Sequence, residues 1–354
     1  MDKFKIQHWM YRKIFRPYLF TIDSERIHDI MTSVGERFEN LGWLIESFYS
    51  FKSSKLHRSV LGIKFANPIG LAAGFDYNGH LAKSMKYIGF GFNTVGTVTA
   101  QSYEGNALPR LARLVKSQSI LVNKGFKSDG AVEIAKRLDK KSLSGHTIGI
   151  SVGSSNIPTV NTIDKAINDY VFTFNIFKDK PYVKYFELNI SCPNTIMTES
   201  FSDIQNFEKL VKKITLLKIK QPIFVKMPSE IDFQSCDNLV SIGLKNGIRG
   251  YIFSNLVKDR TNKLFVKNEI ESVKQNKGNF SGKPCFENSN KLLKHVRAKF
   301  GKKVVLIGLG GVFNAQDAME KLKSGADLVQ LITGMIFEGP QIVGEINNTL
   351  CNSL

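Results

Sequence analysis

The chain has 354 residues, of which 42% are hydrophobic and 11% aromatic. That length supports one large domain with an extension, and that composition is typical of a globular chain and not of a disordered one. The formal net charge is +18, but the lysines are spread in ones and twos, without an arginine-rich block or a zinc-finger spacing. The pattern argues against nucleic-acid binding and leaves attraction to an anionic lipid or an anionic substrate open.

The four cysteines are far apart and form no CxxC pair; they are Cys192, Cys236, Cys285 and Cys351. Such spacing argues against a disulfide framework or a zinc site and fits a reducing compartment. No apolar run approaches the ~18 residues that a membrane span requires, and the first residues lack the apolar core of a signal peptide. The sequence therefore predicts a protein that is cytosolic or that attaches to a membrane from the cytosolic side.

Residues 1–55 differ in pattern from the rest of the chain. Aromatic and cationic side chains mix over 10–20, and Asp23 with Ser24 can cap a helix whose apolar positions from Ile27 to Leu41 keep helical spacing. A further apolar stretch covers 43–51. The pattern indicates short amphipathic helices that pack on the main domain, lie in a membrane interface or frame an apolar tunnel. Composition alone favours simple packing.

The region 56–354 alternates β-prone runs with helical stretches, among them 203–218, 289–300 and 314–324. Eight apolar runs separated in this way are typical of parallel strands buried on both faces. The predicted strands cover 68–73, 92–98, 147–152, 183–190, 222–227, 250–253, 304–307 and 328–332. Eight such units favour a (β/α)₈ barrel over an open doubly wound sheet. The Lys-, Asn- and Gly-rich segment 256–288 is predicted to be a mobile loop at the active site.

In such a barrel the active site lies at the carboxyl ends of the strands. Those ends carry glycines, amides, hydroxyls and one lysine, without a metal-ligand cluster or a Ser/His/Asp pattern. The stretch NISCPN (189–194) is the most informative, because its amides suit a flat polar ring and its thiol can transfer a proton near neutral pH. A simple turn with a buried thiol is the alternative. Lys226 is buried by context and needs an anionic partner, either a reduced flavin or a structural salt bridge.

The last two strand ends indicate a phosphate site. The stretch GLGG (308–311) and the pair Thr333-Gly334 follow the seventh and eighth strands. Barrels bind phosphate at these two ends through backbone N–H groups and a helix N-terminus. A bare GxGG can also serve a tight turn, but its position in the barrel favours phosphate binding.

Several stretches in combination identify the family that the chain resembles. They are RIH (26–28), NPIGLAAGFD (67–76), GTVT (96–99), PRL (109–111), NISCPNT (189–195), VKM (225–227), IGLGG (307–311) and TGMIFEGP (333–340). Together they are similar to dihydroorotate dehydrogenases, specifically to the membrane-associated, quinone-using class, from about residue 11 to residue 348.

The resemblance implies a (β/α)₈ barrel over 56–354 that contains FMN and oxidises dihydroorotate to orotate in pyrimidine biosynthesis. Residues 1–55 would form the quinone entrance at a membrane. The implied location is peripheral, on the cytoplasmic side of a cell inner membrane, with the mitochondrial inner membrane as the alternative. FMN is expected in place of FAD or haem, because the phosphate site follows the last two strands and no dinucleotide fingerprint opens the chain.

The resemblance also implies roles residue by residue. It implies flavin contacts at Ala73, Gly74, Thr97, Asn189, Lys226, Ser254, Gly310, Thr333 and Gly334. It implies substrate contacts at Asn123, Gly125, Phe126, Asn189, Asn194 and Asn255. Cys192 becomes the general base that takes a proton from C5 of the substrate while hydride leaves C6. Because the two leave from opposite sides of one bond, base and flavin must sandwich the substrate. No residue is assigned to a metal.

Two departures from the family pattern concern the base and the flavin. Cys192 stands where the quinone-using class normally has serine, and cysteine is the base of the soluble class. Ser151 stands where an asparagine usually contacts the flavin. Flavin binding is nevertheless expected, since the other implied contacts are present.

Other departures concern the substrate carboxylate. Tyr77 replaces a substrate-binding lysine, and Leu256 replaces a threonine beside the last amide. The loop at 123–126 is one residue short, with Lys127 where an asparagine is usual. Orotate affinity is therefore expected to fall unless Lys124 or Lys127 supplies the missing cation. The alternatives are a flavoprotein of this fold that acts on another small ring, or a catalytically silent flavin-binding or membrane-surface protein.

Overall fold

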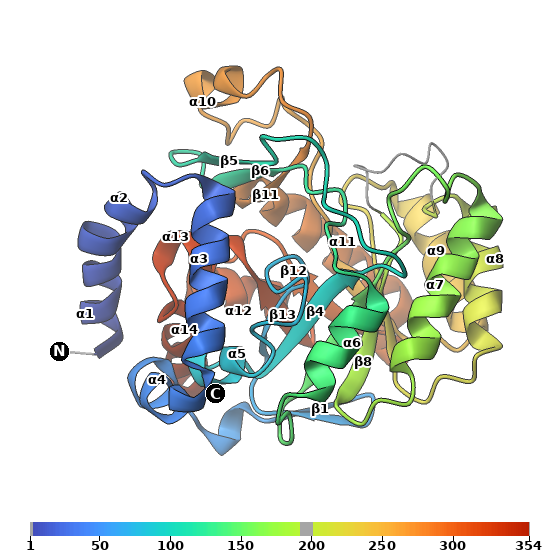
Figure 1. The fold of residues 1–354 in the computed structure, drawn as a ribbon, viewed down its shortest axis with the longest axis horizontal. Coiled ribbons are helices and arrows are strands. Elements are labelled where there is room, and N and C mark those ends of the chain that lie inside the picture. The colour runs from blue at the N-terminus through green and yellow to red at the C-terminus, as the bar shows by residue number, and fades with distance from the viewer. Residues whose placement is uncertain (1–2, 192–200, 354) are drawn as a thin grey trace.

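The computed structural model describes residues 3–191 and 201–353, and its centre is a closed barrel of eight strands (Figure 1). In chain order and around the barrel these are β3 (Ile69–Leu71), β4 (Phe92–Val98), β7 (Ile148–Val152), β8 (Val183–Asn189), β9 (Ile223–Lys226), β10 (Gly250–Phe253), β12 (Val305–Leu309) and β13 (Leu328–Leu331). All neighbours pair in parallel, and β13 closes the barrel on β3. The predicted (β/α)₈ class is confirmed, and each predicted strand overlaps one barrel strand.

Helices cover the outside of the barrel: α5 (Ser84–Ile88), α6 (Ala131–Asp139), α7 (Ile163–Phe177), α8 (Ile204–Thr215), α9 (Phe233–Lys245), α11 (Phe286–Phe300), α12 (Ala315–Lys323), α13 (Thr333–Glu338) and α14 (Ile342–Asn352). Helix α8 illustrates the local rules. The Asp203 carboxylate caps it by accepting two backbone N–H groups, and Phe207, Leu210 and Ile214 bury one face at helical spacing. The helices predicted within 203–218, 289–300 and 314–324 are confirmed.

The barrel interior is filled in layers, because successive side chains of a strand point to opposite faces. Along β8, the side chains of Tyr185, Glu187 and Asn189 contact other barrel strands at three depths of the interior. The lowest layer is aromatic: the Tyr185 ring lies edge-on to Phe224, with 5.7 Å between centroids. The hairpin of β1 (Arg58–Val60) and β2 (Ile63–Phe65) packs its Phe65 on this layer. This aromatic layer fills the lower end of the barrel, so a site can form only at the upper end.

The N-terminal segment is helical and lies on one side of the barrel, blue in Figure 1. It comprises α1 (Lys3–Met10), the π-helical turn η1 (Tyr11–Phe15), α2 (Arg16–Leu19), α3 (Ser24–Arg37) and α4 (Gly42–Tyr49), with the short 3₁₀ helices η2 (Glu39–Leu41) and η3 (Ser54–Leu56). The predicted cap of α3 is confirmed, since the Asp23 carboxylate accepts the N–H groups of Glu25 and Arg26 at 3.0 Å. Among the described helices, none combines the length and the apolar character that crossing a bilayer requires.

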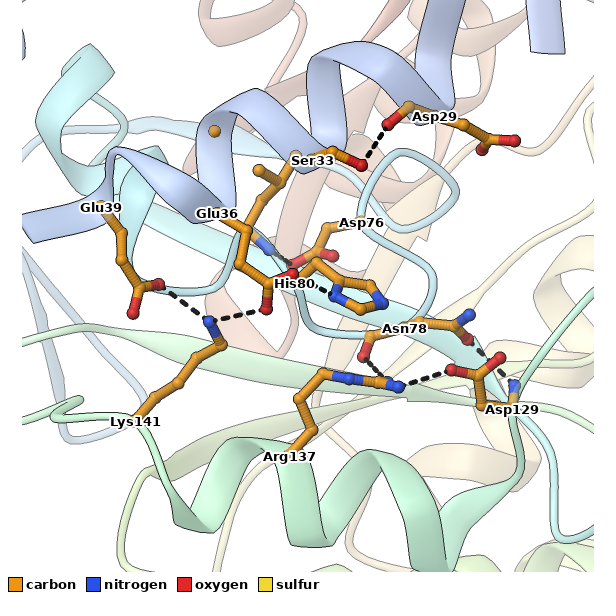
Figure 2. A network of polar contacts seen from close by, with 12 residues as sticks. Asp29, Ser33, Glu36, Glu39, Asp76, Asn78, His80, Asp129, Arg137 and Lys141 are labelled. Atoms are coloured by element: carbon orange, nitrogen blue, oxygen red, sulfur yellow. Dashed lines mark hydrogen bonds and ion pairs between the residues drawn. The ribbon is translucent and has the colours of Figure 1, made fainter. Parts of the chain in front are cut away.

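Ion pairs hold α3 against the barrel (Figure 2). The Glu36 carboxylate contacts His80 at 2.7 Å and Lys141 at 3.1 Å, and Lys141 also contacts Glu39 at 2.8 Å. Burial raises the pKa of Glu36, but these hydrogen bonds outweigh it and hold the pKa below its usual value. The loop that carries His80 also carries Tyr77, so this network fixes the position of α3 relative to that residue.

Helix α1 is attached to the C-terminal helices. His8 contacts Glu338 of α13 at 3.1 Å and Glu345 of α14 at 3.3 Å. Hydrogen bonds to these two carboxylates raise the pKa of His8 to about 9. The Tyr11 hydroxyl donates to the carbonyl of Ile336 at 2.7 Å. The N-terminal helices are therefore attached to α13, which directly follows the last barrel strand, β13.

A separate three-stranded sheet lies beside the barrel mouth, and the sequence did not predict it. It orders β11 (Asn279–Gly282), β6 (Ser119–Val122) and β5 (Leu111–Leu114), all antiparallel. The segment 256–288 lines the cavity as predicted, but it is not one loop, because it contains α10 (Lys267–Ser272) and β11; its mobility stays a prediction. The physical reason is that β11 is a short polar strand between two glycines and is held by pairing with β6, which no local periodicity reveals.

Candidate active site

A cavity of about 460 Å³ opens at the carboxyl ends of the barrel strands. It extends below α3, whose Ile27, Met31 and Val34 form an apolar wall, and reaches Lys226 at the end of β9. This volume is ordinary for a small-molecule or cofactor site. One space therefore joins the N-terminal helices to the strand ends.

All nine residues predicted to contact a flavin line this cavity. They are Ala73, Gly74, Thr97, Asn189, Lys226, Ser254, Gly310, Thr333 and Gly334. They come from the ends of every barrel strand except β7. The closed parallel barrel explains the convergence, because it gathers all carboxyl ends into one ring. Their individual roles remain predictions.

The polar groups on the cavity floor are bonded to one another. Asn189 Nδ2 donates to Thr97 Oγ1 at 3.1 Å, and Thr97 Oγ1 lies 3.0 Å from Ser151 Oγ. The Tyr170 hydroxyl donates to the backbone carbonyl of Asn189 at 2.6 Å. Ser151, the departure on the third barrel strand, therefore supports Thr97 from behind.

The turns after β12 and β13 pass so close to their neighbours that side chains are excluded. A Cβ on Gly334 would lie 1.9 Å from the carbonyl oxygen of Val312, and a Cβ on Gly310, whose φ is +112°, would lie 2.7 Å from Cys285 Cβ. The Thr333 hydroxyl is held by Ser281, to which it donates at 2.9 Å. Both glycines also line the cavity, and bare backbone at these two positions fits a phosphate bound by N–H groups.

The predicted substrate residues are only partly gathered. Gly125, Phe126, Asn189 and Asn255 line the cavity. Asn255 Nδ2 donates to Ser191 Oγ at 2.7 Å, which links the end of β10 to the end of β8. Asn123 lies off the cavity wall, and its Oδ1 accepts from Asn106 Nδ2 at 2.9 Å. Cys192 and Asn194 lie outside the described residues.

A buried polar layer below the cavity escaped the sequence analysis. Glu187 Oε1 accepts from Thr94 Oγ1 at 2.6 Å and from Gln330 Nε2 at 2.7 Å, across the barrel interior. Burial raises the pKa of Glu187, although the charge of Lys226 acts against the rise. The available signal was a carboxylate in the middle of the buried run 183–190. Such a carboxylate requires partners on the inner face of a barrel.

Tyr77 lies in a cluster of ring and cationic groups between α3 and the cavity. Its ring stacks on His28, with 5.3 Å between centroids, and Lys124 Nζ lies 4.2 Å from the Tyr77 ring centre. His28 Nε2 donates to the carbonyl of Phe75 at 2.7 Å. Burial and the charge of Lys124 lower the pKa of His28. Lys127 lies further from the Tyr77 ring, at 5.8 Å.

The fold and the cavity define a (β/α)₈-barrel protein with a small-molecule site at the strand ends and a helical N-terminal segment above it. The sequence model of the family described as dihydroorotate dehydrogenase matches residues 55–354. The chain belongs to this family.

Relatives match over nearly the whole chain. A dihydroorotate dehydrogenase (quinone) of Christiangramia forsetii is 35% identical over 349 residues, covering 96% of this chain and 98% of that protein. A protein of the same name from Bartonella henselae is 34% identical over 342 residues, covering 94% and 89%. The crystal structure of DHODH from Eimeria tenella in complex with ferulenol superposes with a TM-score of 0.77 at 24% identity, covering 94% and 91%. This last likeness concerns the fold.

Proposed function

We propose that this protein oxidises dihydroorotate to orotate in pyrimidine biosynthesis, with FMN as the resident cofactor and a quinone as the electron acceptor. Family membership supports the reaction. The observation that carries the proposal is the single cavity lined by all nine expected flavin positions and continued below α3. A bound flavin supplies the hydride acceptor for this chemistry.

The residues of the cavity have distinct tasks in this proposal. Thr97, Asn189 and Lys226 would hold the flavin ring, and the ammonium of Lys226 would favour negative charge beside it. The turns at Gly310 and Gly334 bind the phosphate through the backbone. Asn189 and Asn255 present amides to the ring of the substrate, and Cys192 takes the C5 proton.

The spectrum of the purified protein tests this proposal. We expect a flavin absorption band, release of FMN and not FAD on denaturation, and bleaching on anaerobic addition of dihydroorotate. A protein that stays colourless after incubation with FMN would contradict the cofactor assignment. Bound FMN without bleaching would favour the alternative in which a related flavoprotein acts on another small ring compound.

We also propose that residues 1–55 form the quinone-access segment and make a peripheral membrane contact, and that 56–354 form the FMN-binding barrel. The segment exposes large apolar side chains: Trp9 is 58% exposed, Tyr18 70% and Trp43 66%. Exposed cations, among them Arg12 and Lys13, lie on the same segment. Aromatic side chains with neighbouring cations are typical of a helix that binds the surface of an anionic bilayer.

Replacing Trp9 and Trp43 together with glutamine is expected to weaken binding to vesicles of phosphatidylcholine and phosphatidylglycerol by roughly tenfold or more, because two large apolar side chains no longer leave water. Sedimentation with vesicles measures this. Flavin reduction by dihydroorotate should be unchanged. Leu216→Gln is the control, since Leu216 is 72% exposed just past the end of α8, outside the access segment. Equal losses in both proteins would refute a membrane contact through residues 1–55.

A further inference from the structure

The charge on the cavity wall is one-sided. The ionisable side chains with cationic forms that line it are His28, Arg113, Lys124, Lys127 and Lys226, and no aspartate or glutamate is among its described lining residues. A wall of this kind favours an anionic ligand. A carboxylate on the substrate would need a cation of this wall that is not already paired within the protein.

Two of these five cations, Lys127 and Arg113, already have partners within the protein. Lys127 Nζ contacts the Glu25 carboxylate at 3.2 Å. Arg113 donates to the carbonyls of Leu19 and Ile22, and its guanidinium lies over the ring of Phe20 at 4.7 Å. Both groups therefore serve the N-terminal segment.

Neither Lys226 nor His28 suits the substrate carboxylate. Lys226 lies too deep in the cavity, and His28 is mostly uncharged. Lys226 ends β9, opposite Asn189 of β8 and one layer above Glu187, where the proposed flavin ring would lie. Burial lowers the pKa of His28, so its neutral form is favoured near pH 7. Lys124 differs from both: its ammonium makes no hydrogen bond or ion pair with any described residue, and its neighbour is the Tyr77 ring.

The backbone around Lys124 is held in an unusual conformation. Gly125 and Phe126 both lie in the left-handed region, with φ of +64° and +65°. A Cβ on Gly125 would lie 2.3 Å from Asn106 Oδ1, so this close turn requires glycine. For phenylalanine the left-handed conformation costs roughly 1–2 kcal/mol. The shortened loop is thus fixed in a shape that directs Lys124 to the cavity wall.

Tyr77 cannot supply the charge itself. Its hydroxyl donates to Asp29 Oδ1 at 3.2 Å, and burial together with Asp29 raises its pKa, so the side chain is neutral. Its ring nevertheless gives the Lys124 ammonium a cation–π contact. The position where the family pattern has a lysine has become a support for a lysine from another loop.

We infer that Lys124, supported by the Tyr77 ring, binds the carboxylate of the substrate and replaces the lysine that the family pattern has at position 77. This inference rests on the proposed function and names the residue that selects a carboxylated ring. The cation reaches the site from the loop after β6 instead of from the loop after β3. The site therefore keeps a lysine ammonium for the substrate carboxylate, although the lysine comes from a different loop.

Calorimetric titration of the FMN-loaded protein with orotate and with uracil tests the inference, because uracil is the same ring without the carboxylate. Lys124→Met should weaken orotate binding by roughly 10- to 100-fold, the effect of losing one charge-assisted hydrogen bond, and should leave uracil binding unchanged. Lys127→Met, which removes a lysine already paired with Glu25, is the matched control. Adding Tyr77→Lys to Lys124→Met should restore much of the orotate affinity.

Each of the other outcomes contradicts either the role of Lys124 or the proposed substrate. Unchanged orotate affinity in Lys124→Met, or an equal loss for orotate and uracil, removes Lys124 from carboxylate recognition while the proposed function stands. A larger loss in Lys127→Met than in Lys124→Met assigns the carboxylate to the other lysine. If the unmodified FMN-loaded protein binds neither ligand, the substrate of the proposed function is wrong and the role of Lys124 with it.

The pH dependence of orotate binding by the unmodified protein gives a test that needs no variant. Burial lowers the pKa of Lys124 to about 8 in the ligand-free protein. A carboxylate binds the protonated form, so orotate affinity should be level below that value and fall as pH rises through it, while uracil affinity shows no such fall over the same range. The ionisable groups that face Lys124 are Glu25, His28 and Asp29 of α3, Tyr77, Arg110 and Lys127. An orotate affinity that stays level from pH 7 to 9 would overturn the inference.

Discussion

Replacing Cys192 with alanine is expected to slow flavin reduction by dihydroorotate by roughly 10²- to 10⁴-fold, the usual contribution of a general base, while FMN stays bound. The reason lies in the chemistry of the side chain. A thiol with a reference pKa near ~8.5 accepts a proton far more readily than a serine hydroxyl does. Anaerobic stopped-flow mixing of the FMN-loaded protein with dihydroorotate measures the rate without any electron acceptor.

Two further variants sharpen this prediction. Cys192→Ser introduces the residue that the quinone-using class normally has, and it should keep part of the rate that Cys192→Ala loses. Cys351→Ala is the thiol control, since Cys351 lies on α14, away from the cavity, and is partly exposed. If Cys192→Ala reduces flavin at the rate of Cys351→Ala, the thiol at 192 is a spectator.

The barrel could be predicted because its information is local. The strands are short and mostly apolar runs, and helices such as α8 carry their own cap and spacing, as Asp203 and the buried face of α8 illustrate. The sheet of β5, β6 and β11 could not be predicted, since its strands are short and partly polar and β11 follows β6 by more than 150 residues. Its stability comes from pairing between distant segments, which leaves no periodic signal.

The residues of the candidate site likewise fall into those that the sequence could predict and those that it could not. Residues at strand ends, such as Thr97 and Lys226, could be grouped because a parallel barrel brings all carboxyl ends together. The choice between Lys124 and Lys127 could not be made, because it depends on Glu25 of α3, which pairs with Lys127 and leaves the other lysine at Tyr77. Side-chain pairing between separate elements is a property of the folded packing.

The buried polar layer around Glu187 contributes to the stability of the barrel. Replacing Glu187 with alanine should lower the free energy of unfolding by roughly 3–5 kcal/mol, because Thr94 and Gln330 lose their acceptor and a cavity remains. Urea denaturation of the FMN-free protein measures this. Glu133→Ala is the control, since Glu133 lies 59% exposed on α6 and its pair with Lys136 contributes little.

The isosteric change to glutamine separates charge from shape. Glu187→Gln keeps an acceptor oxygen for Thr94 and Gln330, so it should cost much less stability than Glu187→Ala at neutral pH.

The direction in which stability changes with pH is also defined. Because burial raises the pKa of Glu187 in the folded protein, the folded state holds its proton more tightly than the unfolded state. The stability of the unmodified protein therefore falls as pH rises above the ordinary glutamate range, and Glu187→Gln should flatten that fall. Equal stability of Glu187→Ala and Glu133→Ala would contradict a structural role for the layer. A steeper fall with pH in Glu187→Gln would instead mean that the carboxylate is held ionised by Lys226.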